Sequence, residues 1–339
     1  MKEIVAPLME WFLKNKRDLP WRGNVTPYEI YISEIMLQQT RVEAVKPYYT
    51  RFLEHAKSFN DLANMSDELL FKLWEGLGYY SRAKNLKKCA SIIAKEYEGE
   101  FPKDYSLAIK LPGIGLYTAG AILSRSYNLK VAAVDGNVLR VFSRLYLDDK
   151  DILKDTTKKY YKNEIEKIMP EDSGAFNEAL MDLGATICMP KVALCDSCPL
   201  QKYCKANKTG KVFEYPKKKL KMEKEYFEYS FIYITNNDKY ILVNKEDGVL
   251  KDMLSPILIP SFLSDYEIID YIKEHYDIDI NNILLYKEGK HIFSHQLWMI
   301  KAYIAYTKDL KDYPSYSLDM IKNRIGLASC YKKFFPFES

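Results

Sequence analysis

The sequence predicts a predominantly α-helical amino-terminal region that ends in a cysteine-rich lobe and is followed by an α+β domain. Three observations support this prediction. Apolar residues recur every three to four positions between residues 1 and 205, which is the period of helices that bury one face. Four cysteines lie within residues 188–204. Beyond residue 228, short runs rich in Tyr, Ile and Val are separated by polar turns, as is typical of strands.

Bulk composition narrows the class of protein. Hydrophobic residues make up 47% and charged residues 28% of the 339-residue chain, a balance that allows two or three globular domains. The net charge of +4 permits nucleic-acid binding without requiring it, because a local basic face matters more than the total. The first 13 residues contain three charged side chains and do not resemble a secretory leader, and no apolar run is long enough to span a bilayer. We therefore expect a monomeric cytoplasmic protein without membrane contact.

Capping residues, Pro and Gly mark the predicted helix boundaries. Thr26, Pro27 and Glu29 predict a helix start, with Thr26 as the cap, Pro27 in the first turn and Glu29 three residues after the cap. Helical patterns follow at residues 30–37, 69–74, 119–123 and 138–142.

The pattern changes at about residue 210. Residues 216–221 form a basic segment that indicates a linker. Residues 229–234 and 240–243, joined by a polar turn, predict a β-hairpin. A helix and a strand are expected at residues 265–275 and 297–306. The predicted organisation is a first region over 1–209, a linker over 210–227 and a second domain over 228–339.

Four of the six cysteines form a compact group. Cys188, Cys195, Cys198 and Cys204 are separated by six, two and five residues on a loop-rich segment. In a reducing compartment, such a group indicates a metal site rather than disulfides. Four thiolates suit either a [4Fe–4S] cluster or a tetrahedral Zn²⁺ ion, and their chemistry alone does not separate the two.

Residues 111–119, Leu-Pro-Gly-Ile-Gly-Leu-Tyr-Thr-Ala, connect two helical patterns. A tight helix–helix turn would explain this segment on its own. Gly113 and Gly115 also permit positive φ and the close approach of a DNA backbone. A phosphate would then meet the amides at the start of the next helix.

Each of two acidic residues, taken alone, has an ordinary structural explanation. Asp135 precedes a helical pattern and would usually be a helix cap, with Asn137 two residues later. Glu34 lies in Ser-Glu-Ile-Met-Leu-Gln-Gln-Thr, residues 33–40, and a lone Glu in a helix is usually solvated.

Together these motifs resemble those of the helix–hairpin–helix DNA glycosylases of the endonuclease III superfamily, and within it the adenine DNA glycosylase (MutY) family. The resemblance is dense over residues 5–205 and rests on the cysteine spacing, the hairpin, the segment 33–40 and Gly-Leu-Gly-Tyr-Tyr at 76–80. It implies a helix–hairpin–helix glycosylase fold with a structural [4Fe–4S] cluster on the four cysteines. It also implies a Nudix-like carboxy-terminal domain.

The same resemblance implies the catalytic roles. Glu34 is the general acid that protonates adenine, Asp135 stabilises the cationic sugar, and Tyr117 and Asn137 support them. Adenine is a poor leaving group until its ring is protonated, so this acid needs a pKa raised by burial. Members that cut the strand carry a lysine where this chain has Tyr117, which cannot form an imine. The resemblance therefore implies a monofunctional glycosylase.

The implied partner is duplex DNA in which adenine lies opposite 8-oxoguanine or guanine. Gly113 and Gly115 would contact a phosphate, Gln39 and Tyr79 would wedge into the base stack, and Arg82 is a candidate phosphate contact.

The carboxy-terminal domain provides a second candidate DNA contact. Phe293, Ser294 and His295 resemble an element of the family that contacts 8-oxoguanine. One departure weakens this part of the resemblance, because residues 253–260 lack the Trp-x-Phe-Pro stretch that is usual in the family.

Two alternatives stay open on sequence grounds. One is another glycosylase of the same superfamily, such as a bifunctional pyrimidine or thymine-mismatch enzyme. The other is a DNA-binding iron–sulfur protein without catalytic activity.

Overall fold

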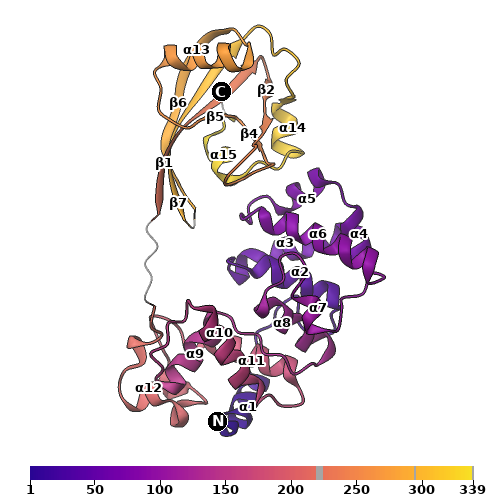
Figure 1. Ribbon diagram of the computed structural model, residues 1–339, viewed down its shortest axis with the longest axis vertical. Helices are drawn as coiled ribbons and strands as arrows, with labels where there is room; N and C mark the ends of the chain where they lie inside the picture. Colours follow the sequence, from indigo (N-terminus) through magenta and orange to yellow (C-terminus); the bar gives the residue numbers. More distant parts are fainter. Residues whose placement is uncertain (219–223, 294, 338–339) are drawn as a thin grey trace. The chain divides into compact units, whose positions relative to one another are not determined.

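The computed structural model describes residues 1–218, 224–293 and 295–337, which fall into two compact units. The first unit comprises Met1–Asn64 and Lys84–Leu220, and the second comprises Met65–Ala83 and Lys221–Ser339 (Figure 1). The domain boundaries expected from the sequence, at residues 209 and 228, stay a prediction, because a compact unit need not coincide with a functional domain.

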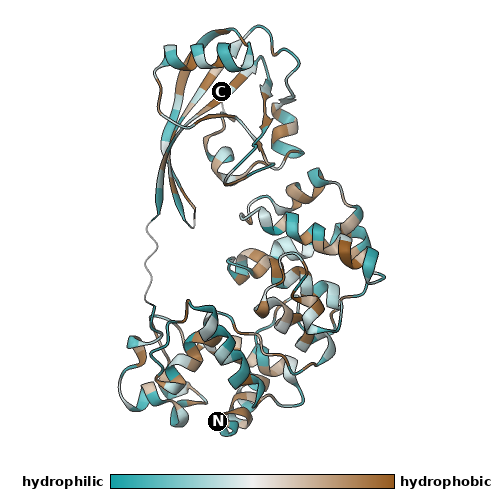
Figure 2. Ribbon diagram, in the orientation of Figure 1, coloured by the Kyte–Doolittle hydropathy of each residue, from teal (hydrophilic) through white to brown (hydrophobic). Residues whose placement is uncertain are grey.

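The first unit is helical in its described part, as the sequence predicts. Figure 2 shows hydrophobic and hydrophilic residues side by side on most of its helices, the pattern of helices that bury one face. Its α-helices are α1 (Val5–Asn15), α2 (Pro27–Leu37), α3 (Val42–His55), α4 (Phe59–Asn64), α6 (Ser81–Glu96), α7 (Tyr105–Ala108), α8 (Leu116–Tyr127), α9 (Gly136–Tyr146), α10 (Asp155–Glu166), α11 (Ser173–Thr186) and α12 (Lys205–Lys208). Short 3-10 helices cover Lys2–Ile4, Cys195–Ser197, Gln201–Tyr203 and Val212–Glu214.

Helix α2 is buried on almost every side. It begins at the predicted place: the Thr26 side chain accepts a hydrogen bond from the Glu29 amide, and Glu29 accepts one from the Thr26 amide. Such a reciprocal cap satisfies two amides that the helix itself leaves without partners. From Tyr28 to Met36 only Glu29 escapes burial, and Ser33 and Glu34 are buried with the apolar residues. The helix therefore carries a carboxylate into the interior.

A second group of helices surrounds its own hydrophobic core. Helices α1, α9, α10 and α11 contribute Leu8, Phe142, Tyr161 and Phe176, each almost inaccessible to solvent. Gly184 permits one close approach between helices in this unit. A Cβ added at Gly184 of α11 would lie 2.6 Å from the Cβ of Asn137.

The second unit contains a mixed β-sheet with the strand order β6-β7-β1-β2-β8, and β5 pairs with β1. β1 and β7 are parallel, and the other pairs are antiparallel. A separate two-stranded sheet joins β3 to β4. The strands are β1 (Glu225–Asn236), β2 (Lys239–Ile241), β3 (Val243–Asn244), β4 (Leu254–Ser255), β5 (Ile257–Ile259), β6 (Ile280–Ile292), β7 (Gln296–Thr307) and β8 (Ser315–Ser317).

Helix α13 (Asp265–Tyr276) lies against one face of this sheet (Figure 1). Ile268 and Ile272 of the helix join Ile232 and Ile234 of β1 in the core of this unit. The predicted hairpin, helix and late strand are confirmed as β1–β2, α13 and β7. The long strand β6 is absent from the prediction, because most of its residues are exposed and its sequence has no apolar alternation.

The second unit also contains α5 (Asp67–Trp74), α14 (Leu318–Asn323) and α15 (Ser329–Phe334). The chain after α5 packs on the segment before α15. The Tyr80 hydroxyl donates to the carbonyl of Leu327 at 3.1 Å, and a Cβ added at Gly326 would lie 2.7 Å from the carbonyl oxygen of Phe71. Only glycine permits two backbones to approach this closely.

None of the helices in the described part of the chain combines the length and the apolarity that a membrane span requires.

Gly120→Ala should destabilise the protein. Gly120 lies in α8, and an added Cβ would be 2.5 Å from the carbonyl oxygen of Ala132. We expect the free energy of unfolding to fall by about 1–3 kcal/mol, the usual cost of overpacking. Gly136→Ala is the matched control, since nothing lies within 4 Å of its added Cβ. In a denaturant titration it should be neutral or slightly stabilising, and an equal loss in both variants would contradict the packing argument.

Candidate active site

Glu34 occupies a buried position that its neighbours in the sequence do not predict. Its Oε2 accepts a hydrogen bond from the hydroxyl of Tyr117 at 2.8 Å, and its Oε1 lies 3.0 Å from Nη1 of Arg125. Burial raises the pKa of Glu34, and the charge of Arg125 and the hydrogen bond from Tyr117 offset part of that rise. A carboxyl group in this environment retains its proton to a higher pH than an exposed one.

Tyr117 connects Glu34 to a second carboxylate. Its hydroxyl contacts Glu34, and its side chain lines a cavity of about 370 Å³ together with Asp135. Burial, and then the negative charges of Glu34 and Asp135, raise the pKa of Tyr117 far above its ordinary value. The tyrosine therefore stays protonated and remains a hydrogen-bond donor.

Asp135 is the cap of α9. Its Oδ1 accepts a hydrogen bond from the amide of Val138 at 2.7 Å, and its Oδ2 accepts one from the side-chain amide of Asn137 at 2.8 Å. Burial raises the pKa of Asp135, although these hydrogen bonds act in the opposite direction. Asn137 is itself fixed, because Arg140 donates to its Oδ1 at 2.8 Å. The carboxylate is thus held in one orientation at the cavity.

A chain of buried ion pairs lies behind Glu34, and the sequence analysis did not identify it. Arg125 joins Glu34 to Glu178, and Arg22 joins Glu178 to Asp182. Burial alone would raise the pKa of Asp182, but its arginine partners lower it below the ordinary value. These residues are far apart in the sequence, so only the packing of α2, α8 and α11 brings them together.

One of the two hairpin glycines has the positive φ that the sequence predicts. Gly113 has a φ of +78°, the left-handed region that favours glycine. Gly115 is the cap of α8 and has no side chain that could accept a hydrogen bond from the first amides of this helix. Those amides and the positive end of the helix dipole suit an anion. Contact with a DNA phosphate stays a prediction.

The two predicted wedge residues lie in separate units. Gln39 has a φ of +59° directly after α2, and Tyr79 has a φ of +50° in the turn after α5. Tyr79 is 43% exposed and available for contact. Insertion of either side chain into a base stack stays a prediction.

Arg82, a candidate phosphate contact, has a different environment from a solvated arginine. It is buried, and its guanidinium donates to the carbonyls of Leu77 and Gly78 at 3.0 and 3.2 Å. It also lies over the rings of Trp74 and Tyr79. Burial lowers the pKa of Arg82 to about 10. The geometry therefore assigns Arg82 to holding the turn, and its contact with phosphate stays a prediction.

The predicted 8-oxoguanine contact lies at the turn between β6 and β7. Phe293 packs against His291 and Trp298, with ring centroids 4.6 and 4.7 Å apart. His295 is exposed, and its carbonyl accepts a hydrogen bond from the amide of Glu225. Ser294 lies outside the described residues. The role of these three residues stays a prediction.

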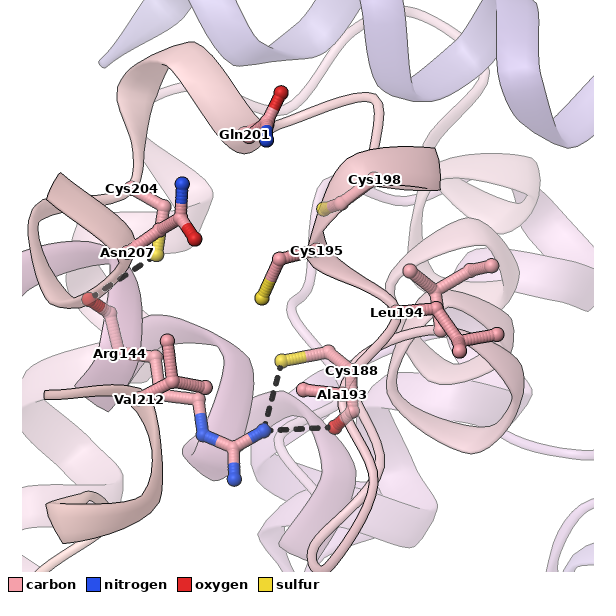
Figure 3. A pocket seen from close by; sticks show the side chains of 11 residues that line it. Arg144, Cys188, Ala193, Leu194, Cys195, Cys198, Gln201, Cys204, Asn207 and Val212 are labelled. Atoms are coloured by element: carbon pink, nitrogen blue, oxygen red, sulfur yellow. Dashed lines mark hydrogen bonds between the residues drawn. The ribbon is translucent and has the colours of Figure 1, made fainter. Parts of the chain in front are cut away.

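The four clustered cysteines line one pocket. Figure 3 shows the sulfur atoms of Cys188, Cys195, Cys198 and Cys204 around a common space. Burial raises the pKa of Cys198 to about 12. The Cys198 thiol would therefore need a metal centre to become a thiolate at neutral pH.

The chemistry of this pocket fits an iron–sulfur cluster. Nη1 of the buried Arg144 lies 3.2 Å from the sulfur of Cys188, and this positive charge would offset the negative charge of bound thiolates. Four cysteine ligands are what a [4Fe–4S] cluster requires, and this pocket supplies four.

Comparisons with known proteins agree with this geometry. The sequence model of the HhH-GPD superfamily of base excision DNA repair proteins matches residues 32–171. The adenine DNA glycosylase of Buchnera aphidicola subsp. Acyrthosiphon pisum (strain APS) is 41% identical over 299 residues, which cover 85% of this chain and 82% of that protein.

Solved structures give the same fold for the first part of the chain. A thermostable thymine-DNA glycosylase matches with a TM-score of 0.57 and 30% identity, covering 61% of this chain and 96% of its own. An endonuclease III–DNA complex matches with a TM-score of 0.53 and 24% identity, covering 62% and 98% respectively, and supports the fold alone. Because the curated relative is matched over most of both chains, this protein belongs to the adenine DNA glycosylase family of the HhH-GPD superfamily and is a DNA glycosylase that hydrolyses N-glycosyl bonds.

Proposed function

We propose that this enzyme removes adenine from duplex DNA in which the adenine lies opposite 8-oxoguanine or guanine. The observation that carries the proposal is the connection of two carboxylates, the buried Glu34 and the half-buried Asp135, through one tyrosine. Glu34 accepts a hydrogen bond from Tyr117, and Tyr117 and Asp135 line the same cavity. The name of the curated relative supports adenine as the base that is released.

Glu34 acts as the general acid. Burial raises its pKa, so this carboxyl keeps its proton to a higher pH than an exposed glutamic acid does. That proton passes to N7 of adenine, a basic ring nitrogen that takes no part in the glycosidic bond. Protonation makes the base a neutral leaving group when the bond between N9 and C1′ breaks.

Asp135 stabilises the positive charge that the sugar acquires as the bond breaks. Its hydrogen bonds with Val138 and Asn137 keep the carboxylate in place without neutralising it. Two carboxyl groups, one protonated and one ionised, are the arrangement that glycosidic bond cleavage requires in general. Water then adds to C1′ and loses a proton, which leaves an abasic site.

Tyr117 favours a monofunctional enzyme. A phenol cannot form the imine through which a lysine cuts the strand. Lys158 and Lys162 of α10 line the same cavity, but each is in an ion pair, with Asp155 and Glu166 respectively. An amine held in an ion pair is a poor nucleophile, so we propose that neither lysine replaces the missing group.

Recognition of the opposite base would involve the second unit. The exposed Tyr79 and the turn that contains Phe293 and His295 belong to it. An aromatic side chain held in a strained turn can insert between bases at low entropic cost, since its conformation is already fixed. We propose that these residues, with Ser294, allow excision only opposite 8-oxoguanine or guanine.

We also propose that Cys188, Cys195, Cys198 and Cys204 bind a [4Fe–4S] cluster. The cluster would order the loop that connects α11 to α12, and its role would be structural. Arg144 donates to the carbonyl of Cys188 as well as facing its sulfur, so the loop and α9 would be fixed together.

The base opposite adenine should control the rate of excision. Single-turnover release should be fastest from adenine opposite 8-oxoguanine, slower opposite guanine and absent opposite thymine. Ser294→Ala should reduce the preference for 8-oxoguanine over guanine. Excision of adenine at one rate from every duplex would contradict recognition of the opposite base, and release of a pyrimidine alone would contradict the proposed substrate.

Glu34→Gln should abolish adenine release while duplex binding is retained. The loss should be about 10²–10⁴-fold, the usual contribution of general acid catalysis. In the wild type, the rate should fall as pH rises through the raised pKa of Glu34, because the acid loses its proton, and the variant should lack this limb. Glu171→Gln, at an exposed carboxylate, is the control and should leave the profile unchanged. Full activity of Glu34→Gln would end the assignment.

Loss of one cluster ligand should remove the cofactor. Cys195→Ser and Cys198→Ser should each lower the iron and sulfide content of the purified protein and weaken binding to duplex DNA. Cys89→Ala and Cys330→Ala change buried cysteines outside the pocket and should retain both. Stoichiometric zinc without iron in the wild type would contradict the cluster.

A further inference from the structure

Arg125 is a buried arginine whose three nitrogen atoms all have partners. Nη1 lies 3.0 Å from Oε1 of Glu34, and Nε lies 2.9 Å from Oε1 of Glu178. Nη2 donates to the carbonyl of Trp21. The Arg125 side chain is only 7% exposed. A planar guanidinium with all edges occupied has one orientation available to it.

Helix α8 holds both oxygen atoms of the general acid. Tyr117, in its first turn, donates to Oε2 of Glu34, and Arg125, in its last turn, contacts Oε1. The side chain of Glu34 comes from α2, which packs along α8. The two contacts therefore fix the plane of the carboxyl group relative to Tyr117 and to the cavity that Tyr117 lines.

We propose that Arg125 is the positioning residue of the general acid, holding Glu34 in place while Glu178 takes up part of its charge. The inference rests on the proposed role of Glu34. Arg125 does not touch the substrate in this proposal, and it acts only through the carboxyl group of Glu34.

The arrangement resolves a conflict between orientation and protonation. An arginine paired with Glu34 alone would favour the carboxylate and oppose its function as an acid. Arg125 instead lies between two carboxylates, and the negative charge of Glu178 raises the pKa of Glu34 while that of Arg125 lowers it. Burial remains the largest influence and raises the pKa. Glu34 is thus oriented by a cation without being committed to the ionised form.

The other charged and titratable groups around Glu34 are consistent with this balance. Tyr117 stays protonated, and its hydroxyl donates to Glu34. Arg22 is near Glu34, but its guanidinium is directed to Asp182 at 2.7 Å and to Glu178 at 3.4 Å. Arg125 is therefore the cation in direct contact with the acid among the described residues.

Two substitutions of opposite effect test the proposal. Arg125→Leu removes the cation, so the pH at which single-turnover adenine release declines should rise, and the maximal rate should fall at least tenfold because Glu34 is no longer oriented. Glu178→Gln removes the competing carboxylate, so the decline in adenine release should occur at a lower pH. Arg125→Lys retains the charge but not the bridging geometry. Its rate should decline near the same pH as that of the wild type, and its maximal rate should be lower.

Controls separate this inference from simple stabilisation and from the proposed function. Lys130→Met removes an exposed cation shortly after α8 and should change neither the limb nor the rate. If Arg125→Leu unfolds, two comparisons with the wild type still decide the question. The rate of Glu178→Gln should decline at a lower pH, and that of Arg125→Lys should decline at the same pH from a reduced maximum. If the wild type is active and the rate declines at the same pH in it and in every Arg125 and Glu178 variant, the positioning role is overturned but the proposed function is not. A wild type that releases no adenine would overturn the proposed function.

Discussion

The burial of one carboxylate constrains much of the first unit. Glu34 is carried into the interior by α2, whose other residues are almost all apolar and buried. An isolated carboxylate in such a place is costly, so hydrogen-bond donors must surround it or it must retain its proton. Tyr117 and Arg125 supply the donors, and both come from α8. The partial compensation leaves a raised pKa, which is the property that an acid catalyst requires.

Helix α9 links the second carboxylate to the cysteine pocket. Asp135 caps its first turn, and Arg140 and Arg144 leave its later turns towards the loop that contains Cys188. Gly184 of α11 allows the close approach that places Asn137 beside Asp135. The same helix thus carries Asp135 and anchors the proposed cluster loop, so a change in that loop would reach the candidate active site through α9.

In the second unit, the turn after α5 is likewise held by side chains of its own neighbourhood. Trp74 and Arg82 hold it through the carbonyls of Leu77 and Gly78. Tyr80 anchors it on Leu327, and the ring of Tyr79 is left exposed. The conformational cost of presenting an aromatic side chain is therefore met by the fold before any DNA is bound.

The amino-acid sequence alone predicted the helical first region, the cap at Thr26, the left-handed glycine of the hairpin and the cysteine group, because each has a local pattern. Glu34 and Asp135 were identified through a family resemblance, and their catalytic roles stay predictions. Only the tertiary structure revealed Arg125, Glu178 and Asp182, since an ion pair between distant residues has no local signature. It also showed that Arg82 holds its own turn through the carbonyls of Leu77 and Gly78, contacts that the sequence does not predict. The strand β6 was not predicted, because most of its residues are exposed. A strand alternates apolar and polar residues only where one of its faces is buried.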